Sequence, residues 1–442
     1  MKMPLSTLAL AVMAASALAD TASDEPGGSG AYNLQEPDAQ EYKTRGEEKA
    51  RGELYGFAMI DMGYNGGSTN DNWFDVIRPT RLPGSDAQIE GDGFTAEGST
   101  YASVRQSRLG VKGWFPTAAG EVHTIFEFEL FGTGVDEGQT TFRLRHAYGE
   151  MGAFGAGQYW SPFMDINVFP NSVEYWGPTG MAFFRNVQFR WMPIRGDNNL
   201  TFALERPGFG RDGAADEVSD NVESIDSAIT RYPVPDLSAA YSFGGDWGYV
   251  RLAGILRYVE WEGQVTTNTG IITADDDAIG WGLNFSTNLK FGPGDSVLKF
   301  AVVGGEAIEN YMNDGTGDLG LHSVSPGCDK NTAVEGNVCT ADFKPIMMLG
   351  TTLFYDLYWS DRWSSTIGFS TYDVDNRDLD NASNFKNARY GLVNLLYYPA
   401  SNVMFGGELQ YGKRENFDDG FDYDTWRIQF SARYNFSFGL GG

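Results

Sequence analysis

The feature that most constrains the fold is a run of thirteen residues near the C-terminus, Trp426 to Phe438, in which polar and apolar side chains alternate without exception. The apolar positions are Trp426, Ile428, Phe430, Ala432, Tyr434, Phe436 and Phe438, and the polar positions are Arg427, Gln429, Ser431, Arg433, Asn435 and Ser437. Successive side chains of a β-strand point to opposite faces of the sheet. The run therefore predicts a strand with one apolar face and one polar face.

The length of this run indicates where the strand lies. Strands in soluble β-sandwiches usually contain about five or six residues. Thirteen residues at about 3.3 Å each, tilted by about 45°, span about 30 Å, which is the thickness of the hydrocarbon core of a bilayer. We therefore interpret the run as the closing strand of a transmembrane β-barrel, with its aromatic face toward lipid and its arginine face toward a water-filled interior.

Fifteen earlier segments have a similar pattern, which brings the predicted barrel to about sixteen antiparallel strands in up-and-down order, an even number typical of bacterial outer-membrane barrels. The expected strands lie at 54–62, 104–115, 121–131, 142–148, 153–160, 183–191, 200–206, 237–243, 249–261, 279–291, 297–308, 346–359, 363–372, 388–398, 403–413 and 426–438. Only half of each strand is apolar, which agrees with a mean hydropathy of −0.32. No segment after the N-terminal leader approaches about 18 consecutive apolar residues, which excludes a helical membrane protein.

The N-terminus has the layout of a secretory signal peptide. Lys2 precedes an apolar core from Leu8 to Ala15, and Ala17-Leu18-Ala19 forms a small-residue end. We predict a cleaved signal peptide at 1–19, a flexible polar periplasmic segment at 20–52, the barrel at 53–438 and a short C-terminal extension at 439–442. Export combined with barrel strands predicts the outer membrane of a Gram-negative bacterium, where lipid and lipopolysaccharide are the expected partners.

Two cysteines, Cys328 and Cys339, lie in one polar loop. Their spacing and the oxidising periplasm favour a disulfide, with two free thiols as the alternative. A zinc site is not expected, because no histidine completes a metal-binding pattern with them. We expect no cofactor and no metal.

The formal charge of −27 comes largely from loops, for example the run Asp275-Asp276-Asp277. The predicted strands contain many of the arginines and lysines, so the net charge says little about the barrel interior. A solvated surface is the favoured interpretation of the acidic loops. The alternative is that they hold divalent cations that bridge lipopolysaccharide.

The segment 161–180 does not alternate and contains Pro162, Pro170 and Pro178. It is either an ordinary outer loop or a loop that folds back into the barrel. Its many bulky apolar residues would be costly in solvent but would pack well against a barrel wall, which favours the inward loop. Its candidate constriction residues are Asp165, Glu174, Tyr175 and Trp176.

The predicted lumen face contains the residues with the clearest functional content. Burying an Arg or Lys in lipid costs about 2–4 kcal/mol, so strand cations are expected to face inward. The candidate cationic wall consists of Arg108, Lys112, Arg143, Arg145, Arg427 and Arg433. Guanidinium groups bind carboxylates in a bidentate manner, so a row of them offers successive weak sites to anionic solutes.

A purely structural interpretation of the same residues stays open. Glu127 and Glu129 also face the predicted lumen, and the arginines can pair with them in a lattice that binds no solute. Arg185 and Arg190 flank the inward loop and are weaker pore candidates, as are the two glutamates.

Several segments resemble the DcaP family of trimeric outer-membrane porins. They are Ser107-Arg108-Leu109-Gly110-Val111-Lys112, Arg143-Leu144-Arg145-His146-Ala147-Tyr148-Gly149, Gly157-Gln158-Tyr159-Trp160-Ser161-Pro162-Phe163-Met164-Asp165 and Tyr411-Gly412-Lys413-Arg414-Glu415-Asn416. The resemblance extends over about residues 52–438. It implies a sixteen-stranded barrel, a homotrimer, and passive diffusion of small anions including dicarboxylates.

Two other function classes, barrel enzymes and adhesins, fit the sequence less well than a porin. Barrel proteases and lipases need a histidine beside a serine or aspartate, and no Gly-x-Ser-x-Gly motif accompanies His123, His146 or His322. We therefore predict that the chain is not an enzyme. An adhesin is also disfavoured, because sixteen strands enclose a lumen too wide for side chains alone to fill. A general non-selective porin remains the nearest alternative.

Overall fold

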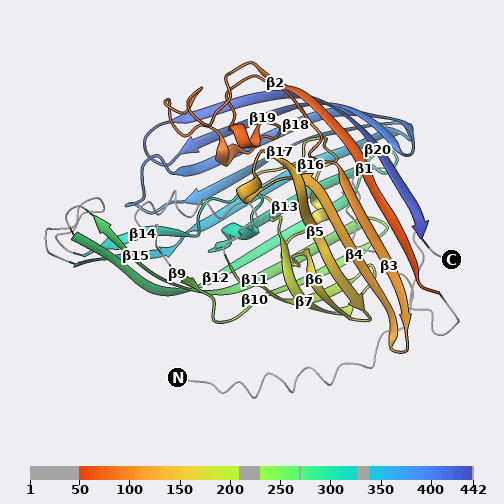
Figure 1. The fold of residues 1–442 in the computed structure, drawn as a ribbon, viewed down its shortest axis with the longest axis horizontal. Coiled ribbons are helices and arrows are strands. Elements are labelled where there is room, and N and C mark those ends of the chain that lie inside the picture. The colour runs from red at the N-terminus through yellow and green to blue at the C-terminus, as the bar shows by residue number, and fades with distance from the viewer. Residues whose placement is uncertain (1–48, 209–228, 268–269, 326–337, 441–442) are drawn as a thin grey trace.

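The computed structural model describes residues 49–208, 229–267, 270–325 and 338–440. Within these residues, sixteen antiparallel strands form one closed barrel (Figure 1). The barrel strands are β1 (Arg51–Asn65), β3 (Arg108–Thr117), β4 (Gly120–Phe131), β5 (Thr140–Met151), β6 (Phe154–Trp160), β7 (Arg185–Ile194), β8 (Asn199–Glu205), β10 (Asp236–Gly245), β11 (Gly248–Thr267), β12 (Gly270–Lys290), β13 (Val297–Glu306), β16 (Met347–Ser360), β17 (Trp363–Asp375), β18 (Phe385–Ala400), β19 (Val403–Asn416) and β20 (Asp422–Leu440). The predicted barrel is confirmed, and each of the sixteen predicted strands overlaps one of these.

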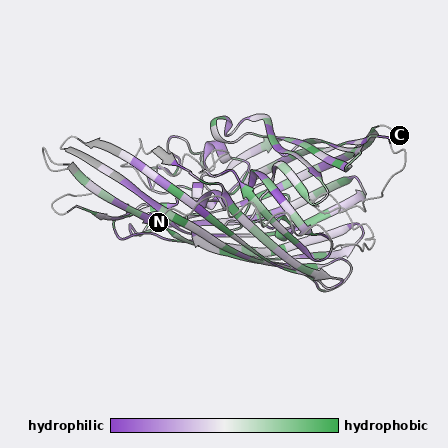
Figure 2. Ribbon diagram, turned by 90° about the horizontal axis from the view of Figure 1, so that it is seen from below, coloured by the Kyte–Doolittle hydropathy of each residue, from purple (hydrophilic) through white to green (hydrophobic). Residues whose placement is uncertain are grey.

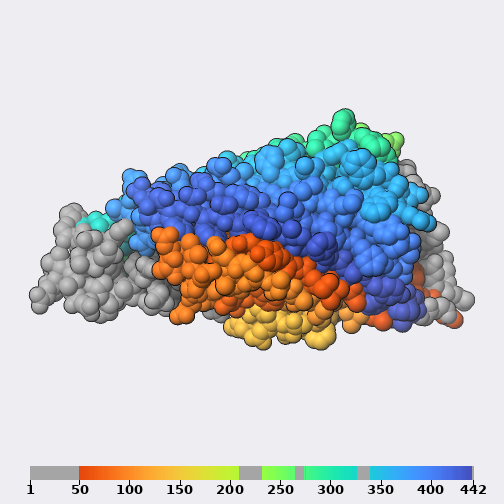
Figure 3. Space-filling model, turned by 90° about the horizontal axis from the view of Figure 1, so that it is seen from above, coloured from red at the N-terminus to blue at the C-terminus, as the bar shows by residue number. Residues whose placement is uncertain are grey.

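The first and last strands close the barrel. β1 pairs with β20 in an antiparallel ladder that runs from Gly52 opposite Leu440 to Asn65 opposite Arg427. Figure 3 shows these N-terminal and C-terminal segments side by side on the surface. On its other edge, β1 pairs with β3 through residues 51–57 and with the short strand β2 (Ser99–Ser103) through residues 61–65.

The last strand shows the predicted alternation of faces. Phe430 and Phe438 are each 59% exposed on the outside of the barrel, whereas Arg427 and Gln429 on the other face are fully buried. Figure 2 shows hydrophobic and hydrophilic residues alternating along the barrel strands. No helix in the described part of the chain has both the length and the apolar character needed to cross a membrane.

Strand β5 departs from simple alternation. Its ladder with β4 pairs Leu144 with Phe128 and His146 with Glu127, so Arg145 is an extra residue with no opposite partner. Such a β-bulge turns the following side chains to the other face of the sheet. Arg145 and His146 therefore both point inward, and each is 2% exposed.

The loop after β6 folds into the barrel, as its sequence predicts, and two other segments accompany it. One is the loop after β1, which contains the 3-10 turns η2 (Asp71–Trp73) and η3 (Pro79–Arg81). The other, at 307–318, contains η6 (Glu309–Tyr311). The 3-10 turn η5 (Ile166–Val168) lies in the loop after β6, and η4 (Gly134–Asp136) lies between β4 and β5. The alternation pattern did not predict the two additional inward segments.

At the end of the barrel with the long loops, β11 and β12 extend beyond the other strands as a hairpin. β9 (Ile229–Arg231) pairs with β11, and β15 (Val338–Pro345) pairs with both β12 and β14 (Leu319–Val324). Cys339 in β15 is disulfide-bonded. Its predicted partner Cys328 lies outside the described residues, as do the predicted signal peptide and almost all of the predicted N-terminal segment.

Candidate functional site in the barrel lumen

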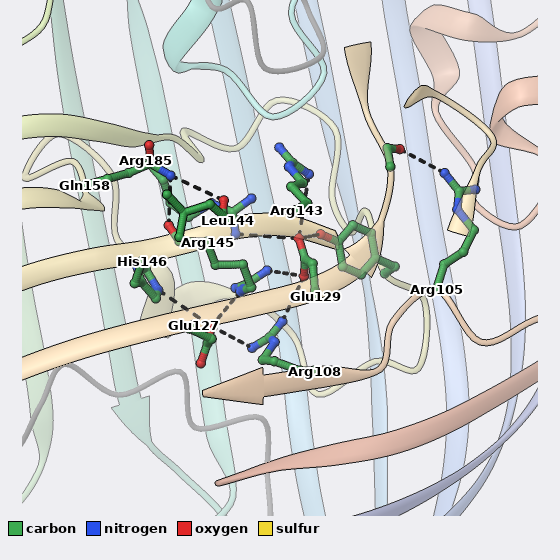
Figure 4. A network of polar contacts seen from close by, with 12 residues as sticks. Arg105, Arg108, Glu127, Glu129, Arg143, Leu144, Arg145, His146, Gln158 and Arg185 are labelled. Carbon is green, nitrogen blue, oxygen red and sulfur yellow. Dashed lines mark hydrogen bonds and ion pairs between the residues drawn. The ribbon is translucent and has the colours of Figure 1, made fainter. Parts of the chain in front are cut away.

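Four arginines and two glutamates form a cluster on the inner wall, which we call the arginine–glutamate lattice (Figure 4). Its members are Arg108 on β3, Glu127 and Glu129 on β4, Arg143 and Arg145 on β5, and Arg185 on β7. Arg145 is at the centre of this lattice. Its Nε lies 2.6 Å from Glu127 Oε1, and its Nη1 lies 2.5 Å from Glu129 Oε2.

The strand register explains why these side chains meet. Glu129 is opposite Arg108 on β3 and opposite Arg143 on β5, so one carboxylate lies between two arginines on the same face of the sheet. Opposite charges on directly paired residues stabilise a sheet. The bulge then adds Arg145 to the same face. Arg185 enters from β7, with its Nη1 3.7 Å from Glu129 Oε1.

Two tyrosines complete the lattice. Tyr55 on β1 donates a hydrogen bond of 2.7 Å to Glu127. Tyr175, in the inward loop, donates a hydrogen bond to Glu129 and stacks on Phe131 with the ring centroids 3.9 Å apart. The inward loop is thereby attached directly to the charged wall, and Tyr175 is the loop residue that reaches it.

The lattice is not electrically balanced. Four guanidinium groups and two carboxylates leave a formal excess of two positive charges. Among the described residues, Arg108 Nε, Arg145 Nη2 and Arg185 Nη1 are buried and have no hydrogen-bond partner, although Arg185 Nη1 retains its ion pair with Glu129. Buried charges normally need compensating partners. The excess positive charge is therefore not compensated within the lattice itself.

Exposure differs between the arginines of the lattice. The Arg143 side chain is 19% exposed, whereas that of Arg145 is 2% exposed and that of Arg108 is 6% exposed. Arg143 is therefore the lattice arginine that a solute reaches most easily. Arg145 instead holds the two glutamates together.

Two other predicted wall cations lie close to the lattice. The guanidinium carbons of Arg108 and Arg433 lie 5.3 Å and 5.6 Å from the ring centroid of Phe57 on β1. Lys112 Nζ lies 3.9 Å from Glu53 and 5.0 Å from the ring centroid of Tyr55, and its side chain is 35% exposed. The structure therefore places cations from β3 and β20 on both sides of β1, in the arrangement expected from the closing strand.

Arg427 does not take part in this wall, contrary to the sequence-based expectation. It donates hydrogen bonds to the Asn65 side chain and to the carbonyl oxygens of Phe74 and Val76, and it is fully buried. The loop after β1 covers it, which the alternation pattern did not reveal. The weaker candidate Arg190 similarly donates to the Trp160 carbonyl and the Gln188 side chain. Both arginines hold the backbone in place.

Most of the predicted constriction residues anchor the inward loop. Asp165 is 3% exposed and accepts hydrogen bonds from Tyr249 (2.7 Å) and Ser286 (2.6 Å) on the wall. Glu174 is 2% exposed and accepts hydrogen bonds from the backbone N–H groups of Ile77 and Gly177. Burial raises the pKa of Glu174 to about 8.

Trp176 joins the inward loop to the two other inward segments. Its ring packs edge-on against Trp73, with the centroids 4.6 Å apart, and the Arg78 guanidinium lies 4.2 Å from the rings of both tryptophans. Trp176 Nε1 also donates to the Asn313 carbonyl at 2.9 Å. The three inward segments therefore form one connected inner layer.

Polar wall residues that alternation assigns to an open lumen bind this inner layer. Asn284, Asn288 and Lys299 donate to the carbonyl oxygens of residues 163, 167 and 169, at 2.8, 2.9 and 2.6 Å. The sequence contained only an indirect signal for these contacts. The loop does not alternate and is rich in apolar residues, and the inward faces of the strands that it contacts contain several amide side chains. In the described part of the chain, no group of three or more His, Cys, Asp or Glu side chains is arranged to hold a metal ion.

Comparison with known proteins agrees with this architecture. A family model described as DcaP outer membrane protein matches residues 87–436. The outer membrane channel DcaP of Acinetobacter baumannii has a similar structure, with a TM-score of 0.67 and 21% identity, over 89% of this chain and 100% of that chain. OmpT of Vibrio cholerae has a TM-score of 0.49 and 12% identity, over 90% of this chain and 100% of that chain. The anion-selective porin from Comamonas acidovorans has a TM-score of 0.48 and 11% identity, over 88% and 100%. No curated protein matches the chain.

Proposed function

Because this chain belongs to the DcaP outer membrane protein family, we propose that its barrel gives passive diffusion to small hydrophilic solutes and favours anions such as dicarboxylates. The proposal starts from the membership of this chain in an outer-membrane protein family and from its likeness to a channel. The selectivity is the proposal. It rests on one observation, the excess of two positive charges in the arginine–glutamate lattice.

The lattice lies in the barrel wall, where the dielectric constant is low. A charge excess fixed there acts on a passing ion more strongly than it would in bulk water. An anion near Arg143 gains this attraction together with hydrogen bonds from the guanidinium group, whereas a cation is repelled. The internal glutamates weaken the field, so a transient site forms rather than a trap, as conduction requires.

The dicarboxylate preference follows from having more than one cation available on the same wall. Arg143 and Lys112 are the more exposed cations, and they belong to strands that flank β4. A solute with two carboxylates meets these cations in succession along the wall, because the residues opposite them on β4, Ile125 and Glu129, are four positions apart. The resemblance to the DcaP family supports the same solute class.

The proposal is tested by the reversal potential of the purified protein in a planar bilayer under a KCl gradient. We expect wild type to give an anion-selective potential and Arg143→Gln to shift it toward zero. Arg389→Gln is the matched control, because Arg389 lies on β18 with its side chain 59% exposed and outside the lattice. A cation-selective wild type, or equal potentials for wild type and Arg143→Gln, would contradict the proposal.

A general non-selective porin is the second candidate. The internal pairing of Arg145 with both glutamates favours it, because these charges satisfy one another. A wild-type reversal potential near zero would identify this alternative.

We also propose that the protein assembles as a homotrimer, as its resemblance to trimeric porins implies, and that outer-membrane lipid and lipopolysaccharide surround it. Cleavage of residues 1–19 and a disulfide between Cys328 and Cys339 belong to the same proposal. The mass of the mature protein, measured before and after reduction and thiol alkylation, tests both of these chemical features.

A further inference from the structure

Three acceptor groups lie next to one another on the inner face of neighbouring barrel strands. Asn186 is on β7, Glu205 is the last residue of β8, and Asp236 is the first residue of β10. Glu205 is directly opposite Asp236 in one ladder, and it is opposite Gln188, two residues after Asn186, in the other. All three side chains are buried, with at most 1% of each exposed. We call Asn186, Glu205 and Asp236 the acceptor triad.

Each carboxylate of the acceptor triad uses one oxygen and leaves the other without a donor. Glu205 Oε1 accepts hydrogen bonds from the hydroxyl groups of Ser161 and Ser238, at 2.8 and 2.5 Å. Asp236 Oδ2 accepts a hydrogen bond of 2.9 Å from the Tyr311 hydroxyl group. Within the ranges that the structure describes, Glu205 Oε2 and Asp236 Oδ1 are buried and have no hydrogen-bond partner. The bonds to the first oxygen of each carboxylate hold the second in place.

The amide of Asn186 adds a third oxygen of the same kind. Its Nδ2 donates to the Arg206 carbonyl oxygen at 2.8 Å and lies 3.4 Å from the Tyr311 hydroxyl group, so the other amide atom is the oxygen. Within the same ranges, Asn186 Oδ1 is buried and has no donor. The single hydroxyl proton of Tyr311 is donated to Asp236, so it does not serve the other two oxygens.

The Tyr311 hydroxyl group is the point at which the acceptor triad converges. It contacts Asp236 and Asn186 directly. Burial of Tyr311, together with the nearby negative charges of Glu205 and Asp236, raises its pKa well above the usual range. Tyr311 belongs to η6, so the acceptor triad on the barrel wall surrounds a residue of the inward segment 307–318.

The charges around the acceptor triad do not balance. The Arg257 guanidinium group pairs with Asp236 at 3.1 Å and with Asp318 at 3.5 Å, so one cation serves two carboxylates. The charge of Arg190 acts on Glu205, but Arg190 donates its hydrogen bonds to other groups. These three carboxylates and two guanidinium groups leave a formal excess of one negative charge. A buried charge normally needs a compensating partner.

We infer that the acceptor triad binds a Ca²⁺ ion between the barrel wall and η6. The ligands are Glu205 Oε2, Asp236 Oδ1 and Asn186 Oδ1, and the ion offsets the excess negative charge. Ca²⁺ accepts carboxylate and amide oxygens in a flexible geometry, whereas Mg²⁺ demands a near-ideal octahedron and usually keeps several water molecules. A buried site with ligands from three strands therefore suits Ca²⁺ better.

This inference differs from the sequence-based expectation of no metal. Only two of the three ligands are carboxylates, and they come from separate strands, so no local motif indicates the site. The register of β7, β8 and β10 brings them together.

The bound ion attaches the inner layer to the wall. The Tyr311 carbonyl oxygen accepts a hydrogen bond of 2.8 Å from the Phe183 N–H group, and the Asn313 N–H group donates to the Met181 carbonyl oxygen at 2.8 Å. The segment 307–318 is thus joined to the end of the inward loop. An ion that binds only the folded barrel also stabilises it by mass action.

The test is Ca²⁺ binding to the full-length protein in detergent after treatment with EDTA, measured by equilibrium dialysis with radioactive calcium. Glu205→Gln keeps an acceptor oxygen for the two serines but removes the charge, and we expect it to bind one Ca²⁺ fewer per chain than wild type. Glu408→Gln is the matched control, because Glu408 is an equally buried inward carboxylate on β19. Both of its oxygens already accept hydrogen bonds, from Gln410 at 2.8 Å and from Asn394 at 2.9 Å, so this variant should bind as many ions as wild type.

The urea midpoint of the barrel distinguishes a bound ion from a proton shared by the two carboxylates. For a bound ion, Ca²⁺ raises the midpoint of wild type and of Glu408→Gln, and Glu205→Gln loses this rise. A wild-type midpoint that responds to pH but not to Ca²⁺ would show that a proton occupies the site and would overturn the inference. Equal numbers of bound Ca²⁺ in wild type and Glu205→Gln would assign the binding to the acidic loops and would also overturn it. Asp236→Asn is a second variant with the same expected loss, in case Glu205→Gln does not fold.

Discussion

The guanidinium group of Arg145 reaches Glu127 at 2.6 Å because Arg145 is the extra residue of a β-bulge. Without that extra residue, β5 would alternate regularly and would have one inward side chain fewer opposite β4. The same Arg145 lies 2.5 Å from Glu129, so a single side chain connects two buried carboxylates. A local irregularity of the backbone thus determines how the charges of the lattice are paired.

Replacing Arg145 is expected to affect stability first. Arg145→Gln leaves two buried glutamates with fewer partners, and breaking a buried ion pair by removing one member costs about 3–5 kcal/mol. The urea midpoint of the barrel, measured by heat-modifiable electrophoretic mobility, should fall. Arg389→Gln, at an exposed site, should leave the midpoint within error of wild type. An unchanged midpoint for Arg145→Gln would show that Arg145 is not needed to hold the lattice together.

The contact between the inward loop and the loop after β1 should depend on pH through Glu174. Burial raises the pKa of Glu174 from its ordinary value of about 4.5 to about 8, so the folded protein favours the protonated carboxyl group. Its stabilising contribution is complete below about pH 4.5 and is lost as the pH rises through about 8. We therefore expect more frequent conductance fluctuations at pH 9 than at pH 6.

Glu174→Gln provides the control for this pH effect, because the amide keeps an acceptor oxygen for Ile77 and Gly177 but does not titrate in this range. Its fluctuation rate should be the same at pH 6 and pH 9. If this variant retains the full pH dependence of wild type, another group is responsible.

The anchoring role of Asp165 predicts a change in loop dynamics. Asp165→Ala removes the acceptor for Tyr249 and Ser286, and each hydrogen bond to a charged group contributes about 1.5–3 kcal/mol. Single-channel recordings should show additional conductance levels as the inward loop leaves the wall. A trace indistinguishable from wild type would mean that Asn284, Asn288 and Lys299 hold the loop without it.

Arg427 should contribute little to ion selectivity despite its charge. It is fully buried and donates to the carbonyl oxygens of Phe74 and Val76, so it holds the loop after β1. Arg427→Gln should keep the wild-type reversal potential while lowering the urea midpoint. A shift as large as that expected for Arg143→Gln would place Arg427 among the residues that passing ions sense.

The barrel can be predicted from the sequence. The period-two pattern of β20 and the similar segments before it assign each strand and its two faces, because solvent on one side and lipid on the other impose the alternation locally, residue by residue. The same logic located most of the inward-facing cations and the loop after β6 that fills part of the lumen.

Which of those cations a solute can reach depends on long-range contacts that the alternation pattern does not encode. Arg427 and Arg143 have the same local pattern in the sequence, yet the loop after β1 buries one and leaves the other partly exposed. The bulge at Arg145 and the two additional inward segments likewise depend on contacts between residues far apart in the chain. The alternation of polar and apolar residues reflects whether each side chain faces lipid or the barrel interior. It does not depend on which distant segment of the chain packs against that side chain.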